Sequence, residues 1–206
     1  VGVFVLMEVI DNFFDNPYEI RNIALKCHSQ TTDVAYPGVR KKVPTETASF
    51  TLKQIKKKFN KNFLISPHEV NGMAFDFIDR TFCAGMCHND EGISEKTLLV
   101  FLTPNPQPNS GIDIFDRINN QAEYTDIVET NKKKEKFLSS KRSFPQRFFY
   151  RREIDRLTKL QKNKISIENK FNRAVLFDSK RVHRAQNYFG LNKSNTRLTL
   201  VSFLWT

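Results

Sequence analysis

Cysteine is scarce in this sequence: Cys27, Cys83 and Cys87 are the three among 206 residues. An odd and sparse number does not provide the paired framework that cross-links small secreted proteins. The sequence therefore predicts a protein of a reducing compartment, and we expect a cytoplasmic location.

Long hydrophobic runs are also missing. No apolar run reaches the roughly 18 residues that a membrane-spanning helix requires, so we expect no membrane partner. The opening run Val1–Leu6 is apolar, but it has neither a basic leader nor a small-residue cleavage site. A first strand is therefore expected there rather than a signal peptide. The chain starts at Val1 rather than at methionine, so the sequence leaves open whether the native N-terminus is complete.

Acidic residues are outnumbered, with 22 Asp and Glu against 33 Lys and Arg, which gives a formal net charge of +11. The excess is concentrated in residues 131–164, which hold thirteen basic residues and three acids. This pattern predicts a basic insertion at about 131–164. It is typical of a solvated face, and it is also compatible with a contact surface for an anionic partner.

Aromatic and apolar residues are plentiful enough for one packed core. The sequence is 39% hydrophobic and contains 19 Phe, and its length suits a single domain over residues 1–206. Asn16 and Pro17 predict the start of a helix that continues to about Lys26, and a second helix is expected at about 51–59. A helical stretch is also expected in the middle of the basic insertion, from the spacing of Ile154, Leu157 and Leu160.

Strand-like patterns dominate the rest of the chain. Apolar runs predict strands at residues 3–10, 73–78, 82–87, 97–103, 112–115, 174–177 and 197–205. Residues 36–40 and 104–111 have the composition of turns or loops. Two helices followed by many short strands favour a mainly β fold with flanking helices, a helix-backed double-sheet barrel, over a parallel α/β arrangement.

Two histidines and one aspartate form the most informative motif. His88 and Asp90 are two residues apart, which places both side chains on one face at a strand end. His183 follows a separate predicted strand at residues 174–177 and reaches the pair only through the fold. Two imidazoles and one carboxylate are the ligand set of a non-haem iron(II) oxygenase site with open coordination positions.

The other metal ligands in the sequence are less suitable. Cys83 and Cys87 have the spacing Cys-x-x-x-Cys and no second cysteine pair, so they do not form the usual structural zinc set. His28 at a helix end and His68 after Pro67 have no such partners. We expect these four residues to have structural roles.

A cation and a hydroxyl lie near the end of the chain. Arg197 and Thr199 open an apolar strand and share one of its faces. A guanidinium binds a carboxylate through two hydrogen bonds, and the hydroxyl adds a donor. The pair suits the distal carboxylate of 2-oxoglutarate. Arg40 is a candidate for an anionic group of a substrate, or is simply an arginine after a Pro-Gly turn.

In these residues the sequence resembles the Fe(II)/2-oxoglutarate-dependent dioxygenase superfamily, within its prolyl-hydroxylase-like part. The motif is His88-x-Asp90, then His183, then Arg197-x-Thr199. A narrower likeness, to a bacterial and phage branch, covers nearly the whole chain. It is carried by the segments 9–17, 36–40, 172–178 and 188–190.

The resemblance implies a double-stranded β-helix, also called a jelly roll or cupin-like fold. It implies that His88, Asp90 and His183 bind Fe(II) and that Arg197, assisted by Thr199, binds the C5 carboxylate of 2-oxoglutarate. The implied reaction uses O2 and 2-oxoglutarate to hydroxylate a C–H bond, and it releases succinate and CO2. By the same analogy, the substrate is a peptide or protein side chain or a small amino-acid-like molecule. Phe82 stands near the place of a family tyrosine that helps to hold the co-substrate.

Two other functions remain open from the sequence. The basic insertion interleaves Lys and Arg with Phe144, Phe148, Phe149 and Tyr150, a pattern that suits phosphate contacts and base stacking. It predicts, as an alternative, an oxygenase that dealkylates nucleic acid or a basic nucleic-acid-binding protein. A further alternative is a non-redox, cupin-like metalloprotein.

Overall fold

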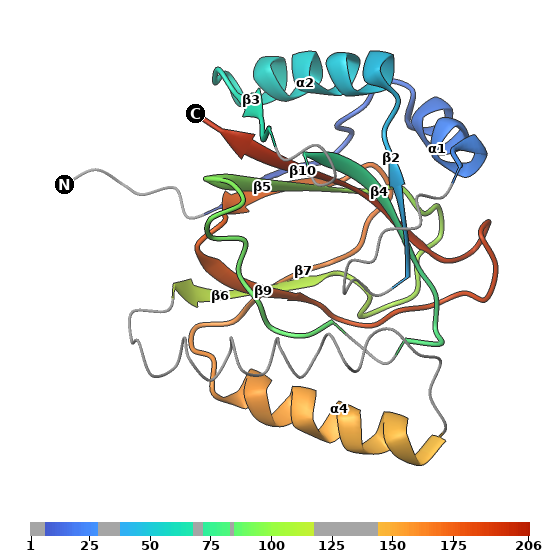
Figure 1. The fold of residues 1–206 in the computed structure, drawn as a ribbon, viewed down its shortest axis with the longest axis vertical. Helices are drawn as coiled ribbons and strands as arrows, with labels where there is room; N and C mark the ends of the chain where they lie inside the picture. Colours follow the sequence, from blue (N-terminus) through green and yellow to red (C-terminus); the bar gives the residue numbers. More distant parts are fainter. Residues whose placement is uncertain (1–6, 29–37, 68–71, 83–84, 118–143) are drawn as a thin grey trace.

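Two sheets face each other in the computed structural model, which describes residues 7–28, 38–67, 72–82, 85–117 and 144–206 (Figure 1). The elements in chain order are β1 (Met7–Ile10), α1 (Pro17–Lys26), β2 (Val39–Lys42), α2 (Thr45–Phe59), β3 (Leu64–Ile65), β4 (Met73–Ile78), β5 (Lys96–Phe101), β6 (Ile112–Arg117), α4 (Phe144–Lys159), β7 (Ile165–Ile167), β8 (Ala174–Asp178), β9 (Arg181–Ala185) and β10 (Arg197–Trp205). Helices α1 and α2 lie outside the larger sheet, and α4 lies outside the smaller one.

The order of the strands defines the fold. The larger, seven-stranded sheet has the order β1-β8-β5-β10-β4-β2, with β3 paired to β10, and the smaller sheet has the order β7-β6-β9. All of these pairs are antiparallel. From β5 onward the chain passes repeatedly from one sheet to the other, as in a jelly roll. The prediction of a mainly β, double-stranded β-helix with flanking helices is confirmed.

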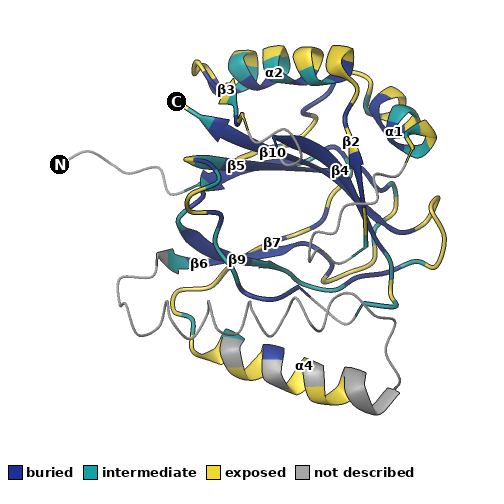
Figure 2. Ribbon diagram, in the orientation of Figure 1, coloured by how far each residue is buried: buried dark blue, intermediate teal, exposed yellow. Residues whose placement is uncertain are grey.

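The two faces of the larger sheet support two separate cores. On β10, Leu198, Leu200 and Leu204 pack in a cluster with the helix residues Ile55 and Phe59. The alternate residues of β10, Val201 and Phe203, pack between the two sheets in a second cluster. This cluster includes Phe177 of β8 in the same sheet and Ile114 of β6 in the smaller sheet. Because side chains alternate along a strand, Arg197 and Thr199 lie on the inward face, between the sheets. Figure 2 shows buried residues along both sheets and exposed residues on the outer sides of the helices.

Local signals explain where the first helix begins, but they do not give the start of the second. The Asn16 side chain accepts a hydrogen bond from the backbone N–H of Glu19, and Pro17 occupies the first helical turn of α1, as predicted. Helix α2 starts at Thr45, earlier than the predicted residue 51. Its buried face is formed by Thr47, Thr51, Ile55 and Phe59, at intervals of four residues. The two threonines on this face interrupt the apolar pattern from which a helix is predicted.

Two further segments differ from the prediction. Residues 39–42 form strand β2 rather than continuing a loop, and the turn before it holds Gly38 at φ +92°, where a side chain would collide with the Phe77 carbonyl. The predicted strand 82–87 is not a named strand in its described part, and its end is represented by an isolated bridge between His88 and His183. His183 follows the predicted strand, which is β8, and itself lies in a further strand, β9, that was not predicted.

The described part of the basic insertion contains helix α4, in agreement with the predicted helical stretch. Ile154, a residue of α4, is buried, whereas Leu160 is exposed just after the helix ends. Residues 131–143 lie outside the described ranges. No helix within those ranges has the length and apolar character that crossing a membrane would require.

Candidate metal centre

The three predicted ligands come together in the folded chain. Ligand atoms of His88, Asp90 and His183 all lie within 4.8 Å of one another. His88 and Asp90 belong to the segment that joins β4 to β5, and His183 lies in the middle of β9. The two histidines are paired through their backbones, and their ring centroids are 4.3 Å apart. The fold thus brings together residues that are far apart in the sequence.

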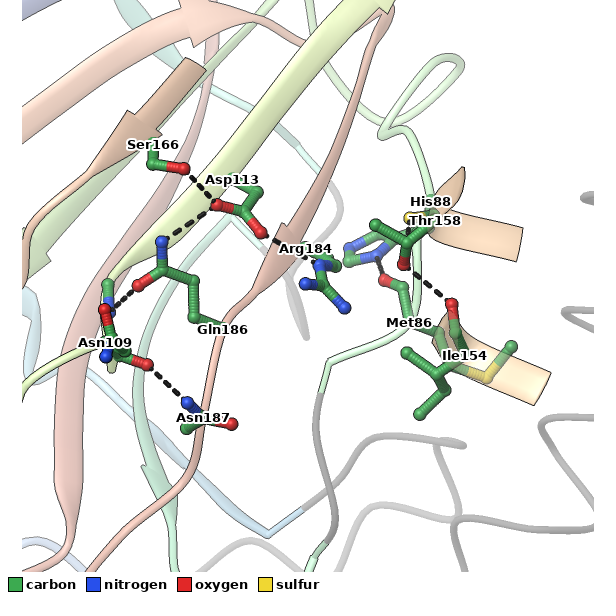
Figure 3. Close-up of polar contacts among 12 residues, drawn as sticks. Met86, His88, Asn109, Asp113, Ile154, Thr158, Ser166, Arg184, Gln186 and Asn187 are labelled. Atoms are coloured by element: carbon green, nitrogen blue, oxygen red, sulfur yellow. Dashed lines mark hydrogen bonds and ion pairs between the residues drawn. The ribbon is translucent and has the colours of Figure 1, made fainter. Parts of the chain in front are cut away.

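Both imidazoles are oriented by a backbone carbonyl two residues earlier in the chain. His88 Nδ1 lies 2.9 Å from the Met86 carbonyl oxygen, and His183 Nδ1 lies 3.1 Å from that of Arg181; Figure 3 shows the first contact. A proton on Nδ1 satisfies each carbonyl and makes Nε2 the nitrogen with the lone pair. The Nε2 atoms face Asp90, at 3.9 Å from Oδ1 for His88 and 3.4 Å from Oδ2 for His183. Three potential donor atoms therefore converge.

Hydroxyl groups hold the aspartate in place. Thr97 donates a hydrogen bond of 2.8 Å to Oδ2 of Asp90, and its hydroxyl also lies 2.9 Å from that of Ser179. Ser179 is bonded in turn to Ser94, and its backbone carbonyl accepts the N–H of Asp90. The sequence motif did not identify these three hydroxyls. Thr97 shares the inward face of its strand with Leu99 and Phe101, and this alternation was the available signal.

Two of the three candidate ligands are shielded from water. Asp90 and His183 are buried, and the Phe177 ring stands edge-on to the His183 ring at a centroid distance of 4.8 Å. The His88 side chain is 32% exposed, so the cluster reaches solvent on that side. This combination of buried ligands and one open side suits a site that must admit a reactant.

Arg197 and Thr199 lie where strand alternation predicts, on the inward face of β10. Arg197 is buried, its Nε donates to the Ser110 carbonyl at 3.1 Å, and its guanidinium lies over the Phe101 ring. Thr199 is fully buried, and its hydroxyl has no hydrogen-bond partner. A buried hydroxyl without a partner is unfavourable unless a ligand completes its hydrogen bonding.

Two other buried residues interact with Asp76. Arg40, a candidate from the sequence for a substrate contact, forms a two-point ion pair with buried Asp76, with Nε–Oδ1 at 2.8 Å and Nη2–Oδ2 at 3.0 Å. Tyr188 was missed by the sequence reasoning. Burial raises the pKa of its phenol to about 12, and Arg197 and Asp76 act on it electrostatically. Only the fold brings Tyr188 near these two charges.

The outer face of the smaller sheet is fixed by a second polar cluster around Asp113, seen in Figure 3. The Asp113 carboxylate accepts hydrogen bonds from Ser166, Arg184 and Gln186. Burial raises the pKa of Asp113, but the three hydrogen bonds lower it by a larger amount. The net result is a pKa below the ordinary value. The cluster joins β6, β7 and β9 and so supports the strand that carries His183.

The remaining candidate ligands are separate from this cluster. His28 is exposed after α1, and Cys27 is partly exposed. Cys87 is a buried thiol that packs against Phe115 and Val182. His68 and Cys83 lie outside the described residues. Among the residues that the structure describes, His88, Asp90 and His183 form the group of His, Cys, Asp or Glu side chains that is suited to hold a metal ion.

Comparison with solved structures supports the fold. A 2OG-Fe(II) oxygenase family oxidoreductase from Burkholderia pseudomallei matches 98% of this chain and 84% of its own, with a TM-score of 0.54 and 8% identity. The non-heme alpha ketoglutarate dependent carbocyclase SnoK from nogalamycin biosynthesis matches 97% and 79%, with a TM-score of 0.58 and 10% identity. HygX from Streptomyces hygroscopicus, solved with nickel and 2-oxoglutarate bound, matches 95% and 81%, with a TM-score of 0.54 and 10% identity.

At these identities the likeness establishes a shared architecture, the double-stranded β-helix, and no more. No curated protein sequence matches the chain. A family model does match, over residues 5–204, which is nearly the whole length. The chain belongs to the family described as "Family of unknown function (DUF6445)".

Proposed function

We propose that this protein is an Fe(II)- and 2-oxoglutarate-dependent dioxygenase. In the proposed reaction a C–H bond of a peptide or protein side chain, or of a small amino-acid-like substrate, becomes C–OH. One oxygen atom of O2 enters the product, and 2-oxoglutarate takes the other as it is converted to succinate and CO2. The observation that carries the proposal is the convergence of His88, Asp90 and His183 within 4.8 Å.

The donor set fits ferrous iron. Two imidazole Nε2 atoms and one carboxylate are the ligands of non-haem Fe(II) oxygenase sites, and they leave coordination positions open for reactants. Each histidine has a carbonyl partner on Nδ1, and Asp90 has Thr97, which are the outer contacts expected of metal ligands. When bound together with 2-oxoglutarate and O2, the iron supplies the oxidising power for the C–H bond.

The inward face of β10 fits the co-substrate. The Arg197 cation and the unpartnered Thr199 hydroxyl are suited to bind one carboxylate between them. HygX, which has a related architecture and was solved with 2-oxoglutarate bound, is consistent with this assignment. The task of the protein chain is then to fix three ligands, hold the keto acid by its far end and limit the access of water.

Anaerobic titration tests the proposal directly. Fe(II) and then 2-oxoglutarate are added to the protein, and a weak visible charge-transfer band is expected from the chelate. The band should be absent in His183→Ala and retained in His28→Ala, because His28 is an exposed histidine far from the cluster in the chain. Metal binding without the band, and without succinate release under air, would instead support a non-redox, cupin-like metalloprotein.

A second candidate function rests on the surface of α4. Phe148 and Phe149 are 55% and 68% exposed, and the neighbouring Arg151 and Arg152 are exposed as well. Exposed aromatic rings beside cations suit stacking on bases and contact with phosphates. A nucleic-acid substrate predicts that single-stranded DNA binds with an affinity that falls steeply with salt and is reduced in Phe149→Ala. Salt-insensitive or absent binding would favour the peptide or small-molecule substrate.

A further inference from the structure

A buried arginine beside the metal cluster has no hydrogen-bond partner for part of its guanidinium. Arg181 opens strand β9 and is 5% exposed. Its Nε and Nη2 atoms are buried and form no hydrogen bond. Its ion-pair partner is Asp116, and the shortest contact, from Nη2 to Oδ1, is 3.6 Å, beyond hydrogen-bonding range.

The other buried arginines of the described residues are held by direct hydrogen bonds. Arg21 donates to the carbonyls of Leu102 and Ser194, at 2.8 and 2.6 Å. Arg40 binds Asp76 through two hydrogen bonds, and Arg197 donates to the carbonyls of Ser110 and Gly111. Because a buried cation with unpaired N–H groups is unfavourable in a folded protein, Arg181 differs from this set in a way that calls for a ligand.

Arg181 is placed to act on the chemistry of the cluster. It lies two residues before His183 on the same strand, so strand alternation puts both side chains on one face. The Arg181 carbonyl also accepts the hydrogen bond that orients the His183 ring. A ligand group bound by Arg181 would therefore lie next to the metal cluster, which reaches solvent beside His88.

The unpaired atoms define the kind of ligand. Nε and Nη2 form one edge of the guanidinium, and their two N–H bonds point in the same direction. Arg40 uses this edge to bind the Asp76 carboxylate, at 2.8 and 3.0 Å. The Arg40–Asp76 pair thus serves as a template, within the same protein, for an oxyanion on Arg181.

We propose that Arg181 anchors a free carboxylate of the substrate, so that the substrate is a small amino acid or a peptide bound by its C-terminus. The proposal rests on the function proposed above, and it narrows the substrate class. An internal side chain of a protein has no free main-chain carboxylate and does not satisfy the Arg181 edge in this way.

The first test is a titration of the metal-free protein labelled with ¹⁵N-arginine. The Nε–H cross-peak of Arg181 is assigned as the one lost in Arg181→Lys. Acetate, an N-acetylated amino acid and a tripeptide with a free C-terminus are added in turn, each beside its amide counterpart. We expect a saturable shift with acetate and no shift with acetamide, while the Arg21 cross-peak stays in place.

The three acids distinguish the two sources of the carboxylate. A shift with acetate and the amino acid alone indicates a small acid, and a shift with the tripeptide as well extends the site to peptide C-termini. The absence of any shift with acetate would overturn the proposal, because it would mean that water alone satisfies the arginine. This titration requires neither iron nor turnover, so a failure of the oxygenase assignment would be seen separately.

Stability gives a second, independent test. Arg181→Met removes a buried charge that lacks partners, so the thermal midpoint of the metal-free protein should stay or rise. The matched change Arg21→Met breaks two direct hydrogen bonds and should lower the midpoint by at least about 2–4 °C. Equal losses in both variants would show that Arg181 is already satisfied in the fold and would overturn the proposal.

The co-substrate provides the last control. Arg181→Lys should leave the apparent KM for 2-oxoglutarate within about twofold in turnover without added substrate, because Arg197 is assigned to that acid. A tenfold or larger rise would mean that Arg181 binds the co-substrate rather than the substrate.

Discussion

The two faces of strand β10 differ in what they contribute to the molecule. Toward the helices, Leu198, Leu200 and Leu204 belong to a large apolar core with α1 and α2. Toward the smaller sheet, the strand begins with Arg197 and Thr199, and only then continues with apolar residues. One strand thus anchors the helical layer and also presents polar groups to the space between the sheets.

The side chains on one face of β10 therefore contribute mainly to the stability of the fold, and those on the other face mainly to ligand binding. The helix-facing side chains fill a close-packed core, where loss of volume is directly destabilising. The inward polar side chains include a hydroxyl that finds no partner in the protein, as expected of a surface arranged for a ligand. Substitutions on the two faces should therefore change different measured quantities.

The largest effect is expected for a ligand of the proposed metal. Asp90→Ala should reduce bound iron and succinate release by more than about 100-fold, because even the loss of a ligand's own hydrogen-bond partner weakens metal sites 10–100-fold. Iron content and succinate are measured on the purified variant. Asp113→Asn is the matched control, since Asp113 is a buried carboxylate outside the metal cluster. This variant should bind as much iron per folded protein molecule as the unchanged protein. Full turnover in Asp90→Ala would remove Asp90 from the site.

The helix-facing core should respond through stability. Leu200→Ala is expected to lower the free energy of unfolding by about 2–5 kcal/mol, because Leu200 is fully buried and its removal leaves a cavity. Urea denaturation of the metal-free protein measures this loss. Thr199→Val, one residue away on the inward face, should not lower stability, because the methyl group replaces a buried hydroxyl that has no hydrogen-bond partner. A similar loss in both variants would contradict the division between the faces.

The inward face should respond through the co-substrate. Arg197→Ala is expected to raise the KM for 2-oxoglutarate by about 10–150-fold, which corresponds to the loss of a charged hydrogen bond of about 1.5–3 kcal/mol. Thr199→Val removes one neutral donor, and a rise of roughly 2–13-fold is expected. Steady-state succinate release at varied 2-oxoglutarate measures both. An unchanged KM in Arg197→Ala would exclude this residue from co-substrate binding.

The smallest effect concerns pH and the buried phenol of Tyr188. The ordinary pKa is 10, and burial raises it to about 12 in the folded protein. Between these pH values the unfolded chain has released a proton that the folded chain retains. This contribution to stability is therefore complete below about pH 10 and decreases as the pH rises toward 12, by about 2–3 kcal/mol in total. Tyr188→Phe should make alkaline unfolding less steep, and an identical pH profile would contradict the prediction.

Local patterns were sufficient for much of the fold. Asn16 and Pro17 predicted the start of α1, and the apolar run at 97–103 overlaps all but the first residue of the buried strand β5. Both signals depend on residues that are neighbours in the chain. The start of α2 at Thr45 was missed because its buried face includes Thr47 and Thr51. The single-domain organisation and the cytoplasmic location stay predictions.

The candidate site could be predicted only in part. His88, Asp90 and His183 were chosen from their chemistry, and their convergence is a property of the fold. Thr97, Tyr188 and Arg181 were not chosen, because their surroundings depend on which strands pair and in what register. The hydrogen bond between the Thr97 hydroxyl and that of Ser179, 82 positions away, leaves no signature in the sequence.

The backbone bridge between His88 and His183 has a consequence for metal uptake. Each amide donates to the carbonyl of the other residue, at 3.0 and 2.8 Å. The spacing of the two imidazoles is therefore set by main-chain pairing before any ion arrives. Stripping the protein with a chelator should leave both amides protected from exchange with deuterated water. The two histidine ligands would then already be in position when iron binds.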